Sequence, residues 1–346
     1  MLIRPVMLAA AILCFAAANL HGRRQAMRTR VVLAALLAAC IAPAWAQVQY
    51  PIKPVRIVVP FPPGGPTDVL ARVLAQKLGE SMGQQFLVDN RPGATGTIAA
   101  AMVAKSPPDG YTLIMHAASS HVSAYLYRQI TYDPIKDFAP VASAGALAFY
   151  LVTHPSLPVK TVKEIIALAK RSPGELAFCS AGSGSGGHLV MAMFMAETGI
   201  KLLHVPYKGA APMIADLIAG QTSLGFDTIS TSQPHVKAGR LRGIAVSSSK
   251  RMPVVPEIPT VMESGVPGFE NYLWFGLLAP AGTPSTVISR LSGEINKVLG
   301  SPDYQQRMLA LGGVAAPNSP EQFADFLKSD TPKWIKVIND TGARVD

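Results

Sequence analysis

Cysteine is scarce in this sequence: Cys14, Cys40 and Cys179 are the three among 346 residues. The first two lie in a leader segment described below, so Cys179 alone would remain in the mature chain. A single cysteine excludes an internal disulfide and makes a thiolate metal cluster implausible. Its apolar neighbours favour a small buried side chain. The seven histidines have neither an H-E-x-x-H motif nor another paired ligand spacing, so we expect no metal site.

Motifs for nucleophilic catalysis are also missing. The sequence has no G-x-S-x-G nucleophile elbow, and nothing in it pairs a nucleophile with a base, which argues against an enzyme. Gly182, Gly184 and Gly187 match the dinucleotide pattern G-x-G-x-x-G. That pattern requires an acidic residue about twenty positions later, and none lies between Glu197 and Asp216. We therefore expect no cofactor.

Runs of lysine or arginine are absent, although the formal net charge is +10. The first 46 residues contain five arginines and no acidic residue, so their removal would lower the net charge to +5. This mild basic excess gives little support for nucleic-acid binding. It would help to attract an anionic small molecule.

A pattern typical of a secretory signal peptide begins at Met27. The basic segment Met27–Arg30 precedes the apolar run Val31–Ile41 and then Ala44–Ala46, which fits the small-x-small rule for cleavage. We predict a signal peptide over residues 1–46, with cleavage before Gln47. Removing 46 residues from 346 leaves 300, which is enough for two domains with their own cores.

The segment before Met27 has its own apolar run, Val6–Ala18, followed by an arginine pair. An over-extended start codon explains residues 1–26 best. A membrane anchor is the alternative, although the run is short for a span. Leu37–Cys40 resembles a lipoprotein processing site, so lipid attachment at Cys40 stays open. We favour a soluble exported protein because the apolar stretch continues past Cys40.

The stretch Pro60–Asp68 joins a predicted strand to a predicted helix. The apolar run Val55–Val59 indicates a buried strand, and apolar residues recur at helical spacing from Val69 onward. We expect Thr67 or Asp68 to cap this helix. Glycines let backbone N–H groups point outward, and the helix N-terminus adds partial positive charge. The loop therefore suits a carboxylate or phosphate; a βα turn without a ligand is the alternative.

Other predicted strands are followed by loops rich in glycine or hydroxyl side chains. These loops are Asn90–Thr97, Ala117–Ser120, Ser180–His188, Pro206–Gly209 and Asp227–Thr228. In open parallel sheets, the carboxyl ends of the strands line the crevice in which ligands bind. Backbone N–H groups, hydroxyls and one lysine suit a ligand with a carboxylate.

Strand and helix patterns alternate along the chain, which favours an α/β architecture with largely parallel sheets. We expect two lobes, residues 47–148 with 275–346 and residues 149–274. The chain would cross near Ala148 and return near Trp274, with the C-terminal helices packed on the first lobe. The starts of those helices are predicted at Thr283-Pro284, Ser301-Pro302 and Ser319-Pro320.

Five motifs, in this order along the chain, are similar to those of one protein family. They are Pro60–Asp68, Asn90–Ala94, Pro107–Leu113, His204–Gly209 and Pro256–Thr260. Together they resemble the substrate-binding proteins of tripartite tricarboxylate transporters, also called Bug-type periplasmic receptors. The similarity extends from Tyr50 to about Gly342. Family members often have Gly-Asn-Gly-Thr/Ser where this chain has Gly182–Ser185, a difference that bears on which ligand binds.

The resemblance implies a two-lobed periplasmic-binding-protein (Venus flytrap) fold, in which each lobe is a mainly parallel sheet flanked by helices and the ligand cleft lies between the lobes. It also implies a periplasmic receptor that captures a small organic acid through loops 60–68 and 181–185 and delivers it to membrane permease subunits. We expect a mono- or dicarboxylate ligand and a monomer. The alternatives are an exported enzyme acting on a small carboxylate and a ligand-sensing partner of a signalling protein.

The predicted ligand-binding residues follow these loops. They are Phe61, Pro63, Gly64, Gly65, Thr67, Asp68, Gly93, Ala94, Ser119, Ser180, Ala181, Gly182, Ser183, Gly184, Ser185, Tyr207, Lys208 and Asp227. We expect Asp68 to shape its loop, since its charge would repel an acidic ligand. Lys208 as a solvated turn residue, and Asp227 as a link between loops or lobes, are the alternatives to ligand contact. His188 is expected to cap or pack at its loop, with a binding role left open.

Overall fold

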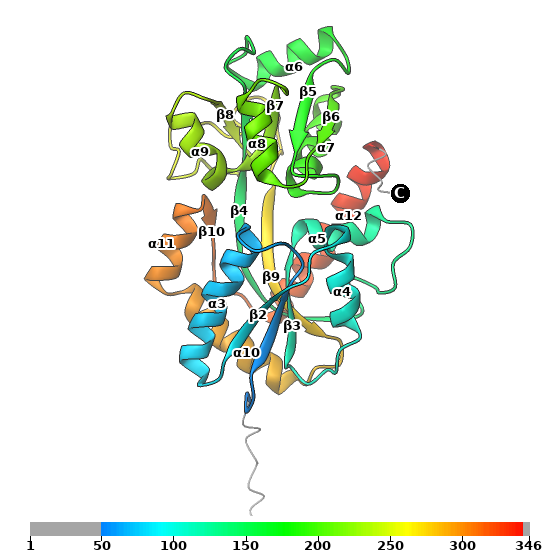
Figure 1. Ribbon diagram of the computed structural model, residues 1–346, viewed down its shortest axis with the longest axis vertical. Coiled ribbons are helices and arrows are strands. Elements are labelled where there is room, and N and C mark those ends of the chain that lie inside the picture. Colours follow the sequence, from blue (N-terminus) through cyan, green and yellow to red (C-terminus); the bar gives the residue numbers. More distant parts are fainter. Residues whose placement is uncertain (1–49, 342–346) are drawn as a thin grey trace, which may run out of the picture. The chain divides into compact units, whose positions relative to one another are not determined.

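Strand β1 (Val55–Val59) has the bounds that its apolar run predicts. It is the first element in the computed structural model, which describes residues 50–341 (Figure 1). The predicted signal peptide, residues 1–46, lies outside the described residues. None of the helices within the described part of the chain combines the length and apolar character needed to cross a membrane.

Helices and strands alternate from β1 onward. The other strands are β2 (Phe86–Asn90), β3 (Thr112–Ala117), β4 (Phe138–Thr153), β5 (Ala177–Ser180), β6 (Leu203–Pro206), β7 (Leu224–Thr228), β8 (Arg242–Val246), β9 (Tyr272–Pro280) and β10 (Gly313–Val314). The helices are α3 (Pro66–Met82), the short 3-10 turn η2 (Ala94–Gly96), α4 (Thr97–Ala104), α5 (Ala118–Leu126), α6 (Val162–Arg171), α7 (Gly186–Thr198), α8 (Ala210–Ile218), α9 (Ile229–Lys237), α10 (Ser285–Leu299), α11 (Pro302–Ala310) and α12 (Pro320–Thr341).

The strands pair in the order β2-β1-β3-β9-β4-β7-β5-β6, and β8 and β10 also pair with β4. β1 is parallel to β2 and β3, and β5 is parallel to β6 and β7. Between these two parallel groups, β9 and β4 run antiparallel to their neighbours. Figure 1 shows β4 and β9 side by side between the two groups.

Strand β4 is longer than the sequence indicates. The apolar run predicts Ala146–Val152, whereas the strand covers 16 residues from Phe138 to Thr153. Its first half is rich in alanine, glycine and serine, which have low strand propensity. It contains two register shifts, between Pro140 and Ala142 and between Ser143 and Gly145. Pairing with β9 and burial, rather than propensity, hold this half in the strand.

The helix starts in the last part of the chain are predicted correctly at two positions of three. Ser301 Oγ accepts the N–H of Tyr304 at the start of α11, and Ser319 Oγ accepts the N–H of Gln322 at the start of α12. The predicted start at Thr283-Pro284 is one residue early, because α10 begins at Ser285 and Pro284 is its N-cap, and Thr283 makes no cap. Its hydroxyl donates to the carbonyl of Pro280 at 2.7 Å, which pulls it into the preceding turn.

Helix α12 packs across β9 through aromatic side chains. The Phe323 ring lies directly over Gly276 of β9, where a Cβ atom would overlap it. The indole N–H groups of Trp274 and Trp334 both donate to Asp330 Oδ2 at 3.0 Å. These contacts attach the C-terminal helix to the strand that returns through the middle of the sheet.

A Gly276→Ala substitution tests this packing. The added methyl group would force the Phe323 ring to move, and we expect a loss of about 1–3 kcal/mol of unfolding free energy. Gly293→Ala is the matched control, because Gly293 is exposed on α10 and a Cβ there meets no atom within 4 Å. It should stabilise the helix by up to roughly 1 kcal/mol. Urea unfolding measures both, and equal stability of Gly276→Ala and the unsubstituted protein would contradict the expectation.

Candidate functional site

Loop 60–68, between β1 and α3, is shaped by its own helix. α3 begins at Pro66, and Gly65 is the N-cap residue without a side-chain cap. The prediction that Thr67 or Asp68 caps this helix is therefore wrong. Proline is well suited to the first helical position, so the helix begins at Pro66 and includes both residues. Of the predicted residues here, Thr67 and Asp68 are buried, Phe61 and Gly65 are half-buried, and Pro63 and Gly64 are exposed.

Asp68 holds this loop together from the first turn of α3. Its Oδ2 accepts the N–H of Gly64 at 2.9 Å and Nε of Arg72 at 3.0 Å. Its Oδ1 accepts Nδ2 of Asn90 at 2.9 Å, and the same amide donates to the carbonyl of Phe61. Burial by itself raises the pKa of the Asp68 carboxyl, but the hydrogen bonds from Arg72, Gly64 and Asn90 outweigh it and hold the pKa below its usual value. All of these bonds serve the loop, as the sequence suggests for Asp68.

Loop 93–97 has an unusual backbone. Gly93 has a φ of 141°, and the non-glycine residues Ala94 and Thr95 have φ of 45° and 50°. Left-handed backbone at non-glycine residues costs free energy and is concentrated at functional sites. A Cβ at Gly96 would lie 2.7 Å from the Cβ of Ser120 on α5.

The same hypothetical Cβ atom of Gly96 would lie 3.0 Å from Pro60 in loop 60–68. Loops 60–68 and 93–97 and the start of α5 are therefore in contact. Ser119, the neighbouring predicted residue, is buried in the first turn of α5.

Loop 180–185 joins β5 to α7. Ser185 is the N-cap of α7, and its Oγ accepts the N–H of His188. The N–H of Gly184 donates to Nδ1 of His188 at 3.1 Å, which confirms that His188 packs at its loop. The N–H of Gly182 donates to Oγ of Ser180 at 3.3 Å. These two glycine N–H groups are therefore engaged inside the protein, while Ser183 is exposed.

Loop 206–209, which contains Tyr207 and Lys208, lies beside loop 180–185. The N–H of Tyr207 donates to the carbonyl of Ser180 at 3.0 Å, and the N–H of Gly209 donates to that of Ala181 at 3.2 Å. Tyr207 is half-buried and Lys208 is exposed.

The loops of the two parallel groups of strands meet at Gly184. This residue is buried, and a Cβ atom there would lie 2.8 Å from Leu126 at the end of α5 and 3.6 Å from Thr95. Loops 60–68, 93–97, 180–185 and 206–209 thus form one continuous set of contacts. Each of these loops was predicted from the sequence, but Thr95 was not among the predicted ligand-binding residues. Only its left-handed backbone and its contacts in the folded chain distinguish it from its neighbours.

Asp227 is turned toward α9. It is 7% exposed, and its Oδ2 accepts the hydroxyl of Ser232 at 2.8 Å. Burial raises its pKa to about 6, against the opposing hydrogen bonds from Ser232 and the N–H of Thr228. Cys179 is fully buried, as predicted, and burial raises the pKa of its thiol to about 11.

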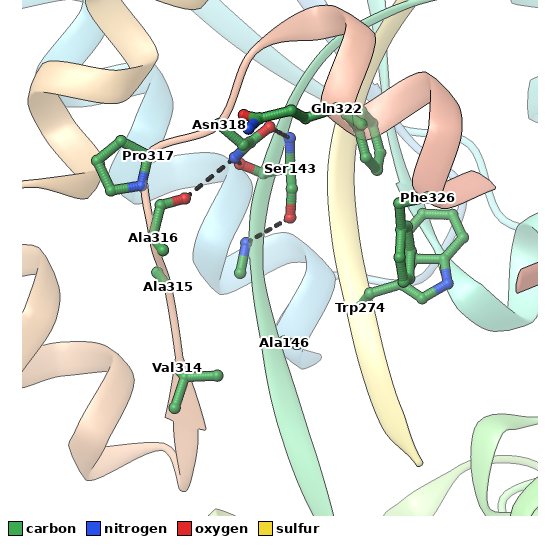
Figure 2. A pocket seen from close by; sticks show the side chains of 12 residues that line it. Ser143, Ala146, Trp274, Val314, Ala315, Ala316, Pro317, Asn318, Gln322 and Phe326 are labelled. Carbon is green, nitrogen blue, oxygen red and sulfur yellow. Dashed lines mark hydrogen bonds between the residues drawn. The ribbon is translucent and has the colours of Figure 1, made fainter. Parts of the chain in front are cut away.

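A separate apolar pocket of about 310 Å³ lies between β4, β9, β10 and α12 (Figure 2). Trp274, Phe323, Phe326 and Val314 supply much of its lining, and Asn318 bonds to the backbone of Ser143 at one side. No predicted ligand-binding residue and no charged side chain lines it. The pocket is therefore a poor match for a carboxylate. No group of three or more histidine, cysteine or acidic residues suited to a metal ion occurs within residues 50–341.

Comparison with known proteins shows which family the chain belongs to. The family model described as "Tripartite tricarboxylate transporter family receptor" matches residues 70–343. The chain belongs to this receptor family. Membership confirms the resemblance drawn from the five sequence motifs.

Solved structures resemble this receptor over most of its length. R. palustris Rpa4515 with adipate is 39% identical, with a TM-score of 0.78 over 85% of this chain and 98% of that one. The periplasmic binding protein BugD is 34% identical, with a TM-score of 0.75 over 85% and 99%. MatC from Rhodopseudomonas palustris with bound malate is 31% identical, with a TM-score of 0.75 over 84% and 100%. The receptor therefore has the α/β periplasmic-binding-protein fold that the sequence predicts.

Two residues that support loop 60–68 were not among the predicted site residues of this receptor. Arg72 follows Asp68 by four positions, a helical spacing at which opposite charges pair. That signal could have identified it. Asn90 belongs to a recognised motif, but its contact with Asp68 depends on the pairing of β1 with β2.

Asp68→Asn tests the role of this carboxylate. Losing the charged acceptor should lower the unfolding free energy at neutral pH by about 1–3 kcal/mol. The folded-state pKa of Asp68 is depressed, so its stabilisation exists above the usual aspartate pKa and is lost as pH falls through the folded pKa. The difference between the variant and the unsubstituted receptor should therefore shrink in acid. Thermal unfolding across pH measures it.

The matched control is Asp325→Asn. Asp325 forms an exposed pair with Lys328 at 3.6 Å, so its substitution should change stability little at any pH. A difference for Asp68→Asn that stays constant down to acid pH would contradict the role assigned to its charge.

Proposed function

We propose that this receptor captures a small organic acid in the periplasm, as a monomer, and delivers it unchanged to the membrane permease of a tripartite transporter. The observation that carries the proposal is the contact of Gly184 with Thr95 and Leu126, where loops of both parallel groups meet. Family membership supports the transport role. Rpa4515 with adipate and MatC with malate support an acid as the ligand class.

The proposed site uses backbone groups more than charged side chains. Its residues are the predicted ligand-binding residues other than Asp68, which supports its loop, and loops 60–68 and 180–185 hold a ligand carboxylate directly and through water. The starts of α3 and α7 lie at these loops. The helix dipole favours an anion at each of these starts. Asp68 neither repels the ligand nor contacts it, because Arg72 and Asn90 bind its carboxylate.

Positive side chains at these loops are few. Arg91 donates to both carboxylate oxygens of Asp89, at 3.0 and 3.1 Å, so its charge is already paired. Lys208 is exposed on loop 206–209. One lysine and backbone groups suit a mono- or dicarboxylate better than citrate with three charges.

Ligand capture involves closure of two lobes, residues 47–148 with 275–346 and residues 149–274. Supporting this division, β4 pairs with β9 up to Ala148 and with β7 from Phe149 onward. A hinge at this change of partner would let the lobes close while both sheets keep their ladders.

A ligand panel tests the function. Adipate, malate, succinate, glutamate, benzoate and citrate are titrated by calorimetry and thermal shift, since an acid at about 100 times its Kd stabilises by about 2.7 kcal/mol. We expect a mono- or dicarboxylate to bind tightest and to be recovered unchanged by NMR. Tightest binding of citrate would overturn the ligand class, and turnover of the acid would overturn the receptor role.

Gly65→Val is the site variant for the same panel. Gly65 has an ordinary φ of −77°, and a Cβ atom there meets nothing closer than 3.9 Å. The variant should therefore fold, yet its side chain would enter the space of the ligand and weaken binding about tenfold or more. Gly293→Ala, on the surface of α10, should bind as the unsubstituted receptor does. Unchanged affinity in Gly65→Val would exclude loop 60–68 from the site.

Export with cleavage before Gln47 is part of the proposal. The receptor purified from periplasm should begin at Gln47 and carry no lipid, which intact-mass and N-terminal mass spectrometry can measure. An acylated Cys40 at the N-terminus would instead show a membrane-anchored receptor.

A further inference from the structure

Three aromatic rings stack behind loop 180–185. Phe178 on β5 and His204 on β6 are register partners, with ring centroids 4.7 Å apart and planes inclined by 16°. His188 on α7 stacks on His204 with centroids 4.1 Å apart, also at 16°. No local pattern in the sequence connects His188 with His204, because the parallel pairing of β5 and β6 brings them together.

Each histidine of this stack is bonded to the loop. Nδ1 of His188 accepts the N–H of Gly184 at 3.1 Å. Nε2 of His204 lies 2.7 Å from Oγ of Ser180, and that oxygen also lies 3.0 Å from the carbonyl of Gly182. The two rings therefore hold the two glycines at which the loop turns, with φ of 131° at Gly182 and 77° at Gly184.

His188 can accept this bond only as a neutral imidazole protonated at Nε2, because a charged ring has no free lone pair. Burial lowers the pKa of His188 to about 4, with the neighbouring His204 adding to the effect. Burial alone lowers the pKa of His204 to about 4. Both rings are therefore neutral at neutral pH, which matches the hydrogen bonds.

We propose that His188 and His204 are positioning residues that fix the backbone of loop 180–185 through Gly184 and Ser180, and thereby set the affinity for the ligand carboxylate. The effect on affinity rests on the proposed function, whereas the effect on the loop does not. Neither histidine needs to touch the ligand, since each acts through the backbone or hydroxyl that it holds.

Two substitutions at His188 separate the hydrogen bond from the stacking. His188→Phe keeps a flat ring on His204 but has no acceptor. His188→Asn has no ring but can place an acceptor near the position of Nδ1. In the ligand-free receptor at neutral pH, hydrogen exchange in peptides covering residues 181–188 should accelerate about tenfold in His188→Phe and stay within about threefold in His188→Asn.

Titration of the same variants with adipate then measures the effect on ligand affinity. We expect a Kd about tenfold weaker in His188→Phe and within about threefold in His188→Asn. The opposite order in exchange, with His188→Asn impaired and His188→Phe normal, would overturn the proposal, because stacking alone would then hold the loop. If the unsubstituted receptor binds none of the mono- and dicarboxylates in the panel, the proposed ligand class fails while the exchange data still decide the positioning role.

A second pair of substitutions, at His204, tests the proposal even if His188→Phe does not fold. His204→Phe keeps the ring between its neighbours and loses the bond to Ser180, whereas His204→Gln can keep a polar group near Nε2. Faster exchange in His204→Phe than in His204→Gln supports the proposal, and equal exchange in the two contradicts it. Thermal unfolding of all four variants confirms that the comparison is made on folded receptor.

Discussion

Strand β4 pairs with β9 along residues 138–148 and with β7 along residues 149–153, and every loop of the site is positioned by that continuity. Backbone hydrogen bonds between buried strands cannot exchange for water, so breaking the ladder would leave unpaired groups in the core. The parallel strands β1, β2 and β3 are fastened to one end of this antiparallel centre, and β5, β6 and β7 to the other. Their loops are thereby brought to meet at Gly184.

The loops themselves carry little that could hold their shape, since glycine adds no contacts and increases backbone freedom. Side chains from the elements behind them do this instead. Asp68 of α3 holds Gly64, and His188 of α7 holds Gly184. The carboxylate of Asp68 is itself bound by Arg72 and Asn90. In a binding site organised in this way, substitutions at a few loop residues can alter ligand specificity while the supporting side chains Asp68 and His188 stay the same.

Some helices and strands could be predicted from the sequence, and others could not. β1 was predicted to the residue, because an uninterrupted apolar run before a Pro/Gly loop has few alternatives. The first half of β4 was missed, since small residues indicate no strand until partners cover them. Helix α5, rich in serine, was missed for a related reason: its residues favour caps and turns in isolation and are helical here while almost entirely buried.

The sequence by itself determined the alternation of strands and helices, the glycine-rich loops and the motifs of the receptor family, because these depend on local periodicity and backbone freedom. It also indicated that Asp68 shapes its loop. Only the tertiary structure decided that Thr95 lies against Gly184 and that His204 stacks on His188. Such contacts join residues from separate strands, and no local pattern records which strands become neighbours.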